Sequence, residues 1–309
     1  MKFINQFIVY LVKILPKLIV HIFAKRYIAG ETLQDAIHVI KALNAKGIVA
    51  TIDVLGEATR TKEEAEEEKK ECIRVLEKID ENKLAAHLSV KPTSLGLTID
   101  KDFCYKQIFE IVTKAKEFHT FVRLDMENSP YTDATFELHC KLRKDFDNVG
   151  VAVQSYLKRT IDDVRNLNKE HTNYRLCKGI YNEPKEIAYK DKQTIRNNYI
   201  EALKLMLDNS NYVGIATHDT YLLNTAYKLI KEKNIPETMF EFQMLYGVTD
   251  HLRDKINADG YKIRIYVPYG VHWYAYALRR MQENPEIAWF VVKSLFSFIK
   301  KRKVKSWHF

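Results

Sequence analysis

The sequence has few cysteines and few glycines, and it lacks several motifs that indicate common kinds of chemistry. The four cysteines among 309 residues are scattered, with no Cys-x-x-Cys pair. This spacing argues against a zinc site and a disulfide framework, and it favours a reducing compartment. The ten glycines form no Gly-x-Gly-x-x-Gly and no Gly-x-x-x-x-Gly-Lys. We therefore expect no bound metal, no Rossmann cofactor site and no P-loop.

Acidic residues are missing from both ends of the chain. Residues 1–30 carry five basic residues and residues 293–309 carry six, with no Asp or Glu in either range. The whole chain has a net charge of +9, which leaves −2 for the part between these ends. A nearly neutral body disfavours a nucleic-acid-binding face.

Uninterrupted apolar runs of membrane-spanning length are also missing. In the range 3–24, Lys13, Pro16 and Lys17 interrupt the apolar residues, whereas a span needs about 20 of them in succession. The segment lacks a small-residue cleavage site, so we expect no signal peptide. Both basic ends have the pattern of amphipathic helices that lie on an anionic bilayer, with packing on the globular body as the alternative. We predict a cytoplasmic protein with peripheral membrane contact.

From residue 48 onward, short β-branched runs alternate with longer amphipathic stretches. Eight repeats of this kind are typical of an α/β fold of the closed (β/α)8, TIM-like class. We predict an N-terminal helical arm at residues 1–47, a catalytic barrel at residues 48–290 and a basic tail at residues 291–309. The predicted strands are Ile48–Leu55, Ala85–Lys91, Thr120–Met126, Val149–Tyr156, Tyr174–Tyr181, Tyr212–Thr217, Phe240–Leu245 and Lys262–Val267. The clearest helical stretches are Thr61–Asp80, Lys185–Asn209, Thr220–Lys233 and Val248–Ala258.

Several predicted strands alternate polar and apolar residues. Because helices cover the outside of such a barrel, the apolar set must face outward and the polar set inward. The inward set then includes Lys91, Asp125, Arg175 and Arg264, mostly near the C-terminal ends of strands, where barrel active sites lie. Buried charges are costly unless they are paired or engaged by a ligand. The pattern predicts either a binding site or an internal lattice of salt bridges.

A second candidate element follows the last strand. In a predicted helix that begins near Val271 or His272, Tyr276 is three residues from Arg279 and four from Arg280. One helix face therefore carries a phenol beside two guanidinium groups, which bind carboxylates in a bidentate manner. The spacing indicates an anion site, although a solvated charged face would have the same pattern.

Eight short motifs in a fixed order resemble the flavin-dependent proline dehydrogenases. They are Ser89-Val-Lys91, Arg123-Leu-Asp125, Val153-Gln154-Ser-Tyr-Leu-Lys-Arg159, Arg175-Leu-Cys-Lys178-Gly179-Ile180-Tyr181, Ala216-Thr217-His218, Phe240-Glu-Phe-Gln-Met-Leu245-Tyr-Gly247, Arg264-Ile-Tyr266 and Tyr276-x-x-Arg279-Arg280. The resemblance implies oxidation of L-proline to Δ1-pyrroline-5-carboxylate by a monofunctional enzyme. It also implies FAD at the C-terminal end of the barrel, hydride transfer from proline C5 to flavin N5, and a membrane quinone as electron acceptor.

The resemblance implies substrate and catalytic roles for the matching residues. Arg175 would lie beside the isoalloxazine ring, where a positive charge favours the reduced flavin, and Asp125 would orient and balance the cations. The proline carboxylate would be held by Lys91, Arg279 and Arg280. The pyrrolidine ring would be enclosed by Tyr181, Leu245, Tyr266 and Tyr276.

The same resemblance implies cofactor contacts and a gate. The FAD contacts would be Met126, Gln154, Lys178, Gly179, Ile180, Thr217 and His218. Glu283 would support the flavin or the helix that carries it. Glu57, after the first strand, would pair with Arg279 and close the site.

Three other functions stay open at this level. A hydroxyproline dehydrogenase is one, although Tyr266 stands where such relatives tend to have a smaller residue and leaves little room for a ring hydroxyl. A Schiff-base lyase that uses Lys91 as the nucleophile is another. The third is a membrane-surface binding protein built on an inactive barrel, which would bind no flavin.

Overall fold

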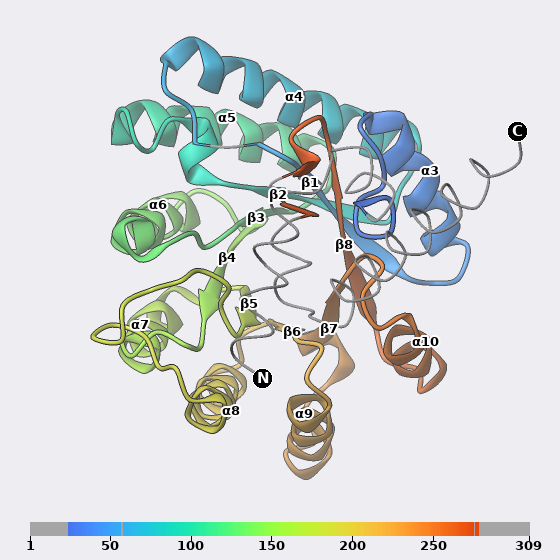
Figure 1. The fold of residues 1–309 in the computed structure, drawn as a ribbon, viewed down its shortest axis with the longest axis vertical. Helices are drawn as coiled ribbons and strands as arrows, with labels where there is room; N and C mark the ends of the chain where they lie inside the picture. Colours follow the sequence, from blue (N-terminus) through green and yellow to red (C-terminus); the bar gives the residue numbers. More distant parts are fainter. Residues whose placement is uncertain (1–23, 57, 275, 278–309) are drawn as a thin grey trace, which may run out of the picture.

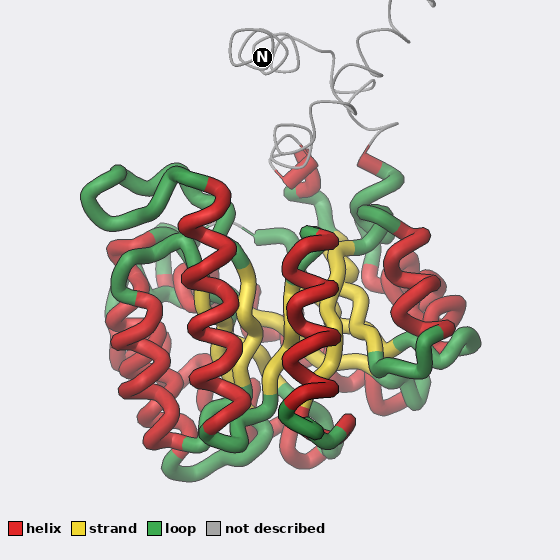
Figure 2. The backbone as a smooth tube through the Cα atoms, turned by 90° about the horizontal axis from the view of Figure 1, so that it is seen from below, coloured by secondary structure: helices red, strands yellow, loops and turns green. Residues whose placement is uncertain are grey.

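Eight parallel strands form a closed barrel in the computed structural model, which describes residues 24–56, 58–274 and 276–277. Consecutive strands pair in sequence order, and β8 closes the barrel by pairing with β1. Helices surround the strands (Figure 1) and run alongside them in the side view (Figure 2). The predicted (β/α)8 fold is confirmed.

Strands and helices follow one another in turn around the barrel. The strands are β1 (Val49–Val54), β2 (Ala86–Val90), β3 (Val122–Leu124), β4 (Val149–Gln154), β5 (Tyr174–Cys177), β6 (Val213–Ala216), β7 (Phe240–Leu245) and β8 (Ile263–Tyr269). The α-helices are α3 (Leu33–Asn44), α4 (Lys62–Glu81), α5 (Lys101–Glu117), α6 (Thr132–Arg143), α7 (Thr160–Leu167), α8 (Lys192–Asp208), α9 (Thr220–Glu232) and α10 (Asp250–Ala258). Short 3-10 helices are η1 (Pro92–Leu95), η2 (Ser129–Tyr131), η3 (Asn168–Glu170) and η4 (Glu237–Met239).

The ends of several elements differ from the sequence prediction, and three of these differences have a bearing on the site. β5 ends at Cys177, four residues before the predicted end, because the chain turns at Gly179, whose φ of 107° favours glycine. β8 instead continues past its predicted end through Pro268, which stays in register with Asp53 of β1. The proline lacks an N–H donor but still supplies a carbonyl acceptor. The helix predicted from residue 185 begins at Lys192.

The apolar set of each strand lies between barrel and helices, as the alternation predicts. Leu88, Val122 and Phe242 are fully buried there, and Ile265 is nearly so. α4 covers this layer with an apolar stripe, consisting of Ala65, Cys72, Val75, Leu76 and Ile79. Burial of such side chains contributes about 1.5–3 kcal/mol each. The outer core therefore fixes the barrel and leaves its interior to polar residues.

The segment before α3 lies across the C-terminal ends of the last two strands. The Ala29 amide donates to the Pro268 carbonyl at 2.9 Å, and the Gly270 amide donates to the Gly30 carbonyl at 3.0 Å. α3 itself begins with a capping box formed by Thr32 and Asp35. The N-terminal segment is thereby joined to the barrel end where active sites of this fold lie.

Membrane-spanning helices and metal-binding clusters are both absent from the described part of the chain. No helix there combines the length and apolarity needed to cross a bilayer. No group of three His, Cys, Asp or Glu side chains there is placed to hold a metal ion.

Candidate active site at the C-terminal end of the barrel

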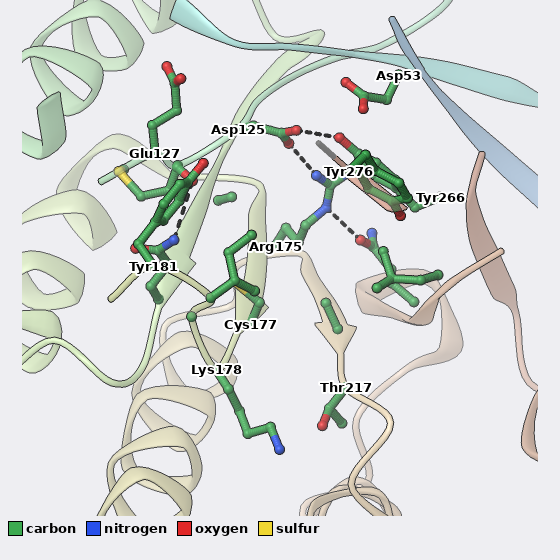
Figure 3. Close-up of a pocket in the computed structure, with 18 of the residues that line it drawn as sticks. Asp53, Asp125, Glu127, Arg175, Cys177, Lys178, Tyr181, Thr217, Tyr266 and Tyr276 are labelled. Carbon is green, nitrogen blue, oxygen red and sulfur yellow. Dashed lines mark hydrogen bonds and ion pairs between the residues drawn. The ribbon is translucent and has the colours of Figure 1, made fainter. Parts of the chain in front are cut away.

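A cavity of about 1170 Å³ opens at the C-terminal end of the barrel. Pockets for one small ligand usually measure about 300–1,000 Å³, so this one has room for more than a small substrate. Every predicted site residue that the structure describes lies in its wall, several of them shown in Figure 3. These residues are Lys91, Asp125, Met126, Gln154, Arg175, Lys178, Gly179, Ile180, Tyr181, Thr217, His218, Leu245, Tyr266 and Tyr276.

Four predicted residues lie outside the described part of the chain. They are Glu57, Arg279, Arg280 and Glu283. Their roles as gate, carboxylate ligands and cofactor support stay predictions.

Asp125 is the centre of a hydrogen-bond network in this cavity. Its Oδ2 accepts from the Tyr266 hydroxyl at 2.6 Å, and its Oδ1 accepts from the Ser89 hydroxyl at 2.6 Å and pairs with Arg175 (Figure 3). Burial opposes ionisation, but the charges of Arg175 and Lys91 outweigh it and lower the pKa of Asp125. Asp125 therefore remains an anion that holds a cation and a phenol in fixed positions.

Arg175 is held in place from two sides. Its Nε donates to Gln243 Oε1 at 2.8 Å, while its guanidinium carbon lies 5.1 Å from the centre of the Tyr266 ring. A Cβ atom at Gly214 would lie 2.2 Å from Gln243 Nε2, so a larger residue there would displace the amide. Glycine in β6 thus makes room for the side chain that positions Arg175.

Lys91 forms its ion pair with Asp53, a residue that the sequence analysis missed. Asp53 lies on β1 and is 1% exposed. Burial raises the pKa of Asp53 despite the nearby ammonium. Burial also disfavours the charged lysine, but Asp53 and Asp125 outweigh it and raise the pKa of Lys91. Lys91 is therefore cationic. Asp53 could have been found from the sequence, because it lies between Ile52 and Val54 at an inward position of the strand pattern.

A second group of cations lines another part of the cavity. Lys178 pairs with Asp219 at 3.4 Å, and Arg196 binds both oxygens of Asp219 at 2.9 and 2.8 Å. Lys192 also lines the cavity, so this wall carries a third cation besides the two that pair with Asp219. Such an excess suits an anionic group such as a phosphate. Lys192 and Arg196 were missed, although their spacing of four residues places them on one helix face.

Gln154 carries a buried acceptor that the described part of the chain leaves without a partner. Its Nε2 donates to the Met126 carbonyl at 3.3 Å, but its Oε1 has no hydrogen bond there. A buried acceptor without a donor typically costs about 1–3 kcal/mol. A bound molecule with an N–H or O–H group would relieve this cost. The orphaned oxygen and the excess of cations both fit a large, polar, anionic cofactor.

His218 supports the protein as well as lining the cavity. Its Nδ1 is 2.7 Å from the Thr249 hydroxyl, and its Nε2 accepts from the Leu245 amide at 3.1 Å. These contacts fix the ring and hold the end of β7. The predicted role of His218 as a cofactor contact is not tested by this geometry.

A TIM-like barrel with paired cations and carboxylates at its C-terminal end belongs to the class of barrel enzymes that bind anionic small molecules. The family model for proline dehydrogenase matches residues 36–293. Proline dehydrogenase 1 of Bacillus subtilis is 35% identical over 272 residues, which cover 88% of this chain and 90% of that relative. Proline dehydrogenase of Deinococcus radiodurans is 35% identical over 277 residues, covering 88% and 89%. The chain therefore belongs to the proline dehydrogenase family, flavin-dependent enzymes that oxidise proline to Δ1-pyrroline-5-carboxylate.

Solved structures with the same barrel are longer proteins. Proline utilization A of Bdellovibrio bacteriovorus, inactivated by N-propargylglycine, aligns with a TM-score of 0.80 and 26% identity over 85% of this chain and 32% of that one. Proline utilization A of Bradyrhizobium japonicum shares the fold, with a TM-score of 0.74 and 21% identity over 84% of this chain. This chain thus spans about a third of these larger proteins.

Proposed function

We propose that this chain uses FAD to oxidise L-proline, with hydride transfer from proline C5 to flavin N5. The observation that supports the proposal is one cavity with two charged regions. One region contains Lys91 and the Asp125–Arg175 pair, and the other contains Lys178 and Arg196. The first suits an amino acid carboxylate, and the second suits the phosphates of a dinucleotide.

The cofactor would supply a two-electron acceptor, and this chain would supply its contacts. Gln154 would accept a hydrogen bond from it, and Lys178, Lys192 and Arg196 would lie near its phosphates. Arg175 would place a fixed positive charge near the accepting ring. Further contacts would come from Met126, Gly179, Ile180, Thr217 and His218, with Glu283 as the predicted support.

The substrate would be held by its carboxylate. Lys91 would bind this group together with the predicted ligands Arg279 and Arg280, and Asp53 would keep the ammonium of Lys91 in position. Hydride transfer needs close approach and exclusion of water. An enclosing wall for the ring would come from Tyr181, Leu245, Tyr266 and Tyr276.

A Schiff-base mechanism is disfavoured by the state of Lys91. A nucleophilic lysine must lose its proton, whereas Asp53 and Asp125 raise the pKa of Lys91 above its usual range. The geometry therefore favours Lys91 as a cationic anchor for an anion.

Proline is favoured over hydroxyproline by the position of Tyr266. Its hydroxyl is bound to Asp125 and its ring lies over Arg175, so displacing the side chain would break both contacts. We expect higher turnover on proline than on trans-4-hydroxyproline in a direct comparison of the two substrates. Equal turnover would argue for the second activity.

An anaerobic titration of the purified protein with L-proline tests the main proposal. We expect the visible flavin absorbance to bleach as Δ1-pyrroline-5-carboxylate forms, because no acceptor is present to reoxidise the cofactor. The proposal is wrong if the protein binds no flavin after incubation with FAD. It is also wrong if bound flavin stays oxidised at saturating proline.

A membrane quinone and the cytoplasmic face of a membrane complete the proposal. The basic residues of both chain ends support contact with anionic lipid. Flotation with anionic liposomes would compare the full chain with a version that lacks residues 293–309. We expect weaker binding after truncation, and equal binding would remove the role of the C-terminal segment. Reoxidation by a soluble quinone would test the acceptor, and Glu57 remains the proposed gate.

A further inference from the structure

Residues 24–31, which we call the N-terminal strap, are fastened to the barrel at the cavity. Besides the two backbone bonds of Ala29 and Gly30 to the end of β8, the Arg26 Nε donates to the Gly247 carbonyl at 3.1 Å. The Trp273 indole donates to Glu31 Oε1 at 2.8 Å. Contacts at both ends of the strap hold the residues between them at a defined position.

The strap approaches the β7–α10 connection as closely as a backbone allows. A Cβ atom at Gly247 would lie 1.7 Å from the Arg26 carbonyl oxygen, and the φ of Gly247 is 70°. Any other residue there would displace the strap. This close packing of the Arg26 backbone on Gly247 also determines the position of Tyr27, the next residue of the strap.

Tyr27 lines the same cavity as the residues of β7 and β8 and is 2% exposed. Its hydroxyl is buried and makes no hydrogen bond with any residue that the structure describes. Burial is the main reason that the pKa of this phenol is raised, so it stays a neutral donor. Buried tyrosine hydroxyls normally have a partner. Arg26 and Glu31 of the strap have such partners, whereas the buried hydroxyl of the cavity-lining Tyr27 has none among the described residues.

We infer that Tyr27 is a ligand-contacting residue, whose hydroxyl hydrogen-bonds to a polar atom of a molecule bound in this cavity. The inference rests on the proposed function, since it assigns the ligand to FAD or to proline. Both carry oxygens that accept from a phenol: the ribityl and phosphate oxygens of FAD, and the proline carboxylate. Through the strap, the N-terminal part of the chain would complete a site otherwise built from the barrel.

The test compares Tyr27→Phe with the wild-type full-length protein in three measurements. FAD affinity is measured by quenching of flavin fluorescence on the flavin-depleted protein. Proline affinity is measured from the proline-concentration dependence of the rate of anaerobic flavin reduction in the flavin-loaded protein. Thermal unfolding is measured without flavin. We expect an affinity for FAD or for proline to weaken about fivefold, as loss of one hydrogen bond predicts. The affinity that weakens, for FAD or for proline, shows which of the two molecules the Tyr27 hydroxyl contacts.

Thermal stability separates this role from a structural one. Without ligand the hydroxyl has no partner among the described residues, so Tyr27→Phe should keep or raise the Tm of the flavin-free protein. Tyr174→Phe is the matched control, because its buried hydroxyl donates to Asn168 at 2.8 Å at the start of β5. The control should lower the Tm and leave both affinities unchanged.

Two results would overturn the inference. One is a lower flavin-free Tm or a failure to fold for Tyr27→Phe, since the hydroxyl would then have a partner in the protein. The other is a change of less than about twofold in both affinities, as expected if a trapped water satisfies the hydroxyl. If the wild type itself binds neither FAD nor proline, the proposed function fails, which distinguishes the two failures.

Discussion

The interior of the barrel has charged residues at both ends, but their surroundings differ. At the N-terminal end, Arg264 binds both oxygens of Glu241, at 2.5 and 3.1 Å, and also donates to the Ala50 carbonyl at 2.6 Å. At the C-terminal end, the Lys91 ammonium has three donors and binds one partner, Asp53, in the described part of the chain. The side chain of Arg264 is 4% exposed, and that of Lys91 is 18% exposed.

This difference separates a structural ion pair from a binding group. The sequence pattern left a salt-bridge lattice and a ligand site as alternatives for the inward charges. The N-terminal end is a lattice of salt bridges, in which Arg264 and Glu241 bind each other. At the C-terminal end, the Lys91 ammonium lines the cavity and keeps hydrogen-bond donors for a ligand. Gln243 joins the two, because its amide donates to Glu241 at 2.7 Å and accepts from Arg175 at 2.8 Å.

The largest expected effect on stability is at the N-terminal end. Arg264→Met should lower the free energy of unfolding by about 3–5 kcal/mol, because the buried Glu241 carboxylate loses its buried partner and keeps only the half-exposed Lys262 at 3.4 Å. Urea denaturation would measure the loss. The double variant Arg264→Met/Glu241→Gln should recover part of it by removing the uncompensated charge. A loss below about 1 kcal/mol, as for a surface pair, would contradict the distinction between the two ends.

Lys91 should affect catalysis more than folding. Lys91→Met should lower kcat/KM for proline roughly 30- to 1000-fold, because the proline carboxylate loses a buried cationic partner. This factor corresponds to a loss of about 2–4 kcal/mol in binding free energy. The substitution also leaves Asp53 unpaired. Adding Asp53→Asn should therefore restore stability but not activity. Steady-state kinetics and urea denaturation on the same samples would measure activity and stability separately. Recovery of activity in the double variant would contradict the role of Lys91 as a ligand of the proline carboxylate.

Glu68, a residue of α4 that lies beside Gly56 of the cavity wall, should make the stability of the protein depend on pH. It makes no hydrogen bond or ion pair with a described residue, and its carboxylate lies 3.2 Å from where a Cβ of Gly56 would be. Burial, partly offset by Lys91, raises its pKa from 4.5 to about 7. Between these values the folded protein binds the proton more tightly than the unfolded chain. Stability is therefore lost as the pH rises through this window.

Replacing this acid should remove that pH dependence. Glu68→Gln should be more stable than the wild type by about 1–3 kcal/mol at pH 8, with a smaller difference at pH 5. Urea denaturation at several pH values would measure it. Glu66→Gln, on the exposed side of the same helix, is the matched control. Parallel pH profiles for the wild type and Glu68→Gln would contradict the assignment.

Several features of the site could be predicted from the sequence because they follow strand periodicity. Inward side chains such as Asp125 and Arg175 alternate with outward apolar ones, and parallel strands end at the same side of a barrel. Lys192 and Tyr27 were missed because they reach the cavity from a surface helix and an N-terminal strap. Neither has a period that relates it to the strands.

By itself, the sequence determined the closed barrel, the inward placement of its polar residues and the family motifs, because these depend on local periodicity and order along the chain. Only the tertiary structure decided which charges pair. Asp53 rather than Asp125 is the ion-pair partner of Lys91, and Glu241 neutralises Arg264 at the N-terminal end of the strands. The reason is physical: pairing depends on distances between side chains of different strands and on their burial, and neither quantity is encoded in sequence spacing.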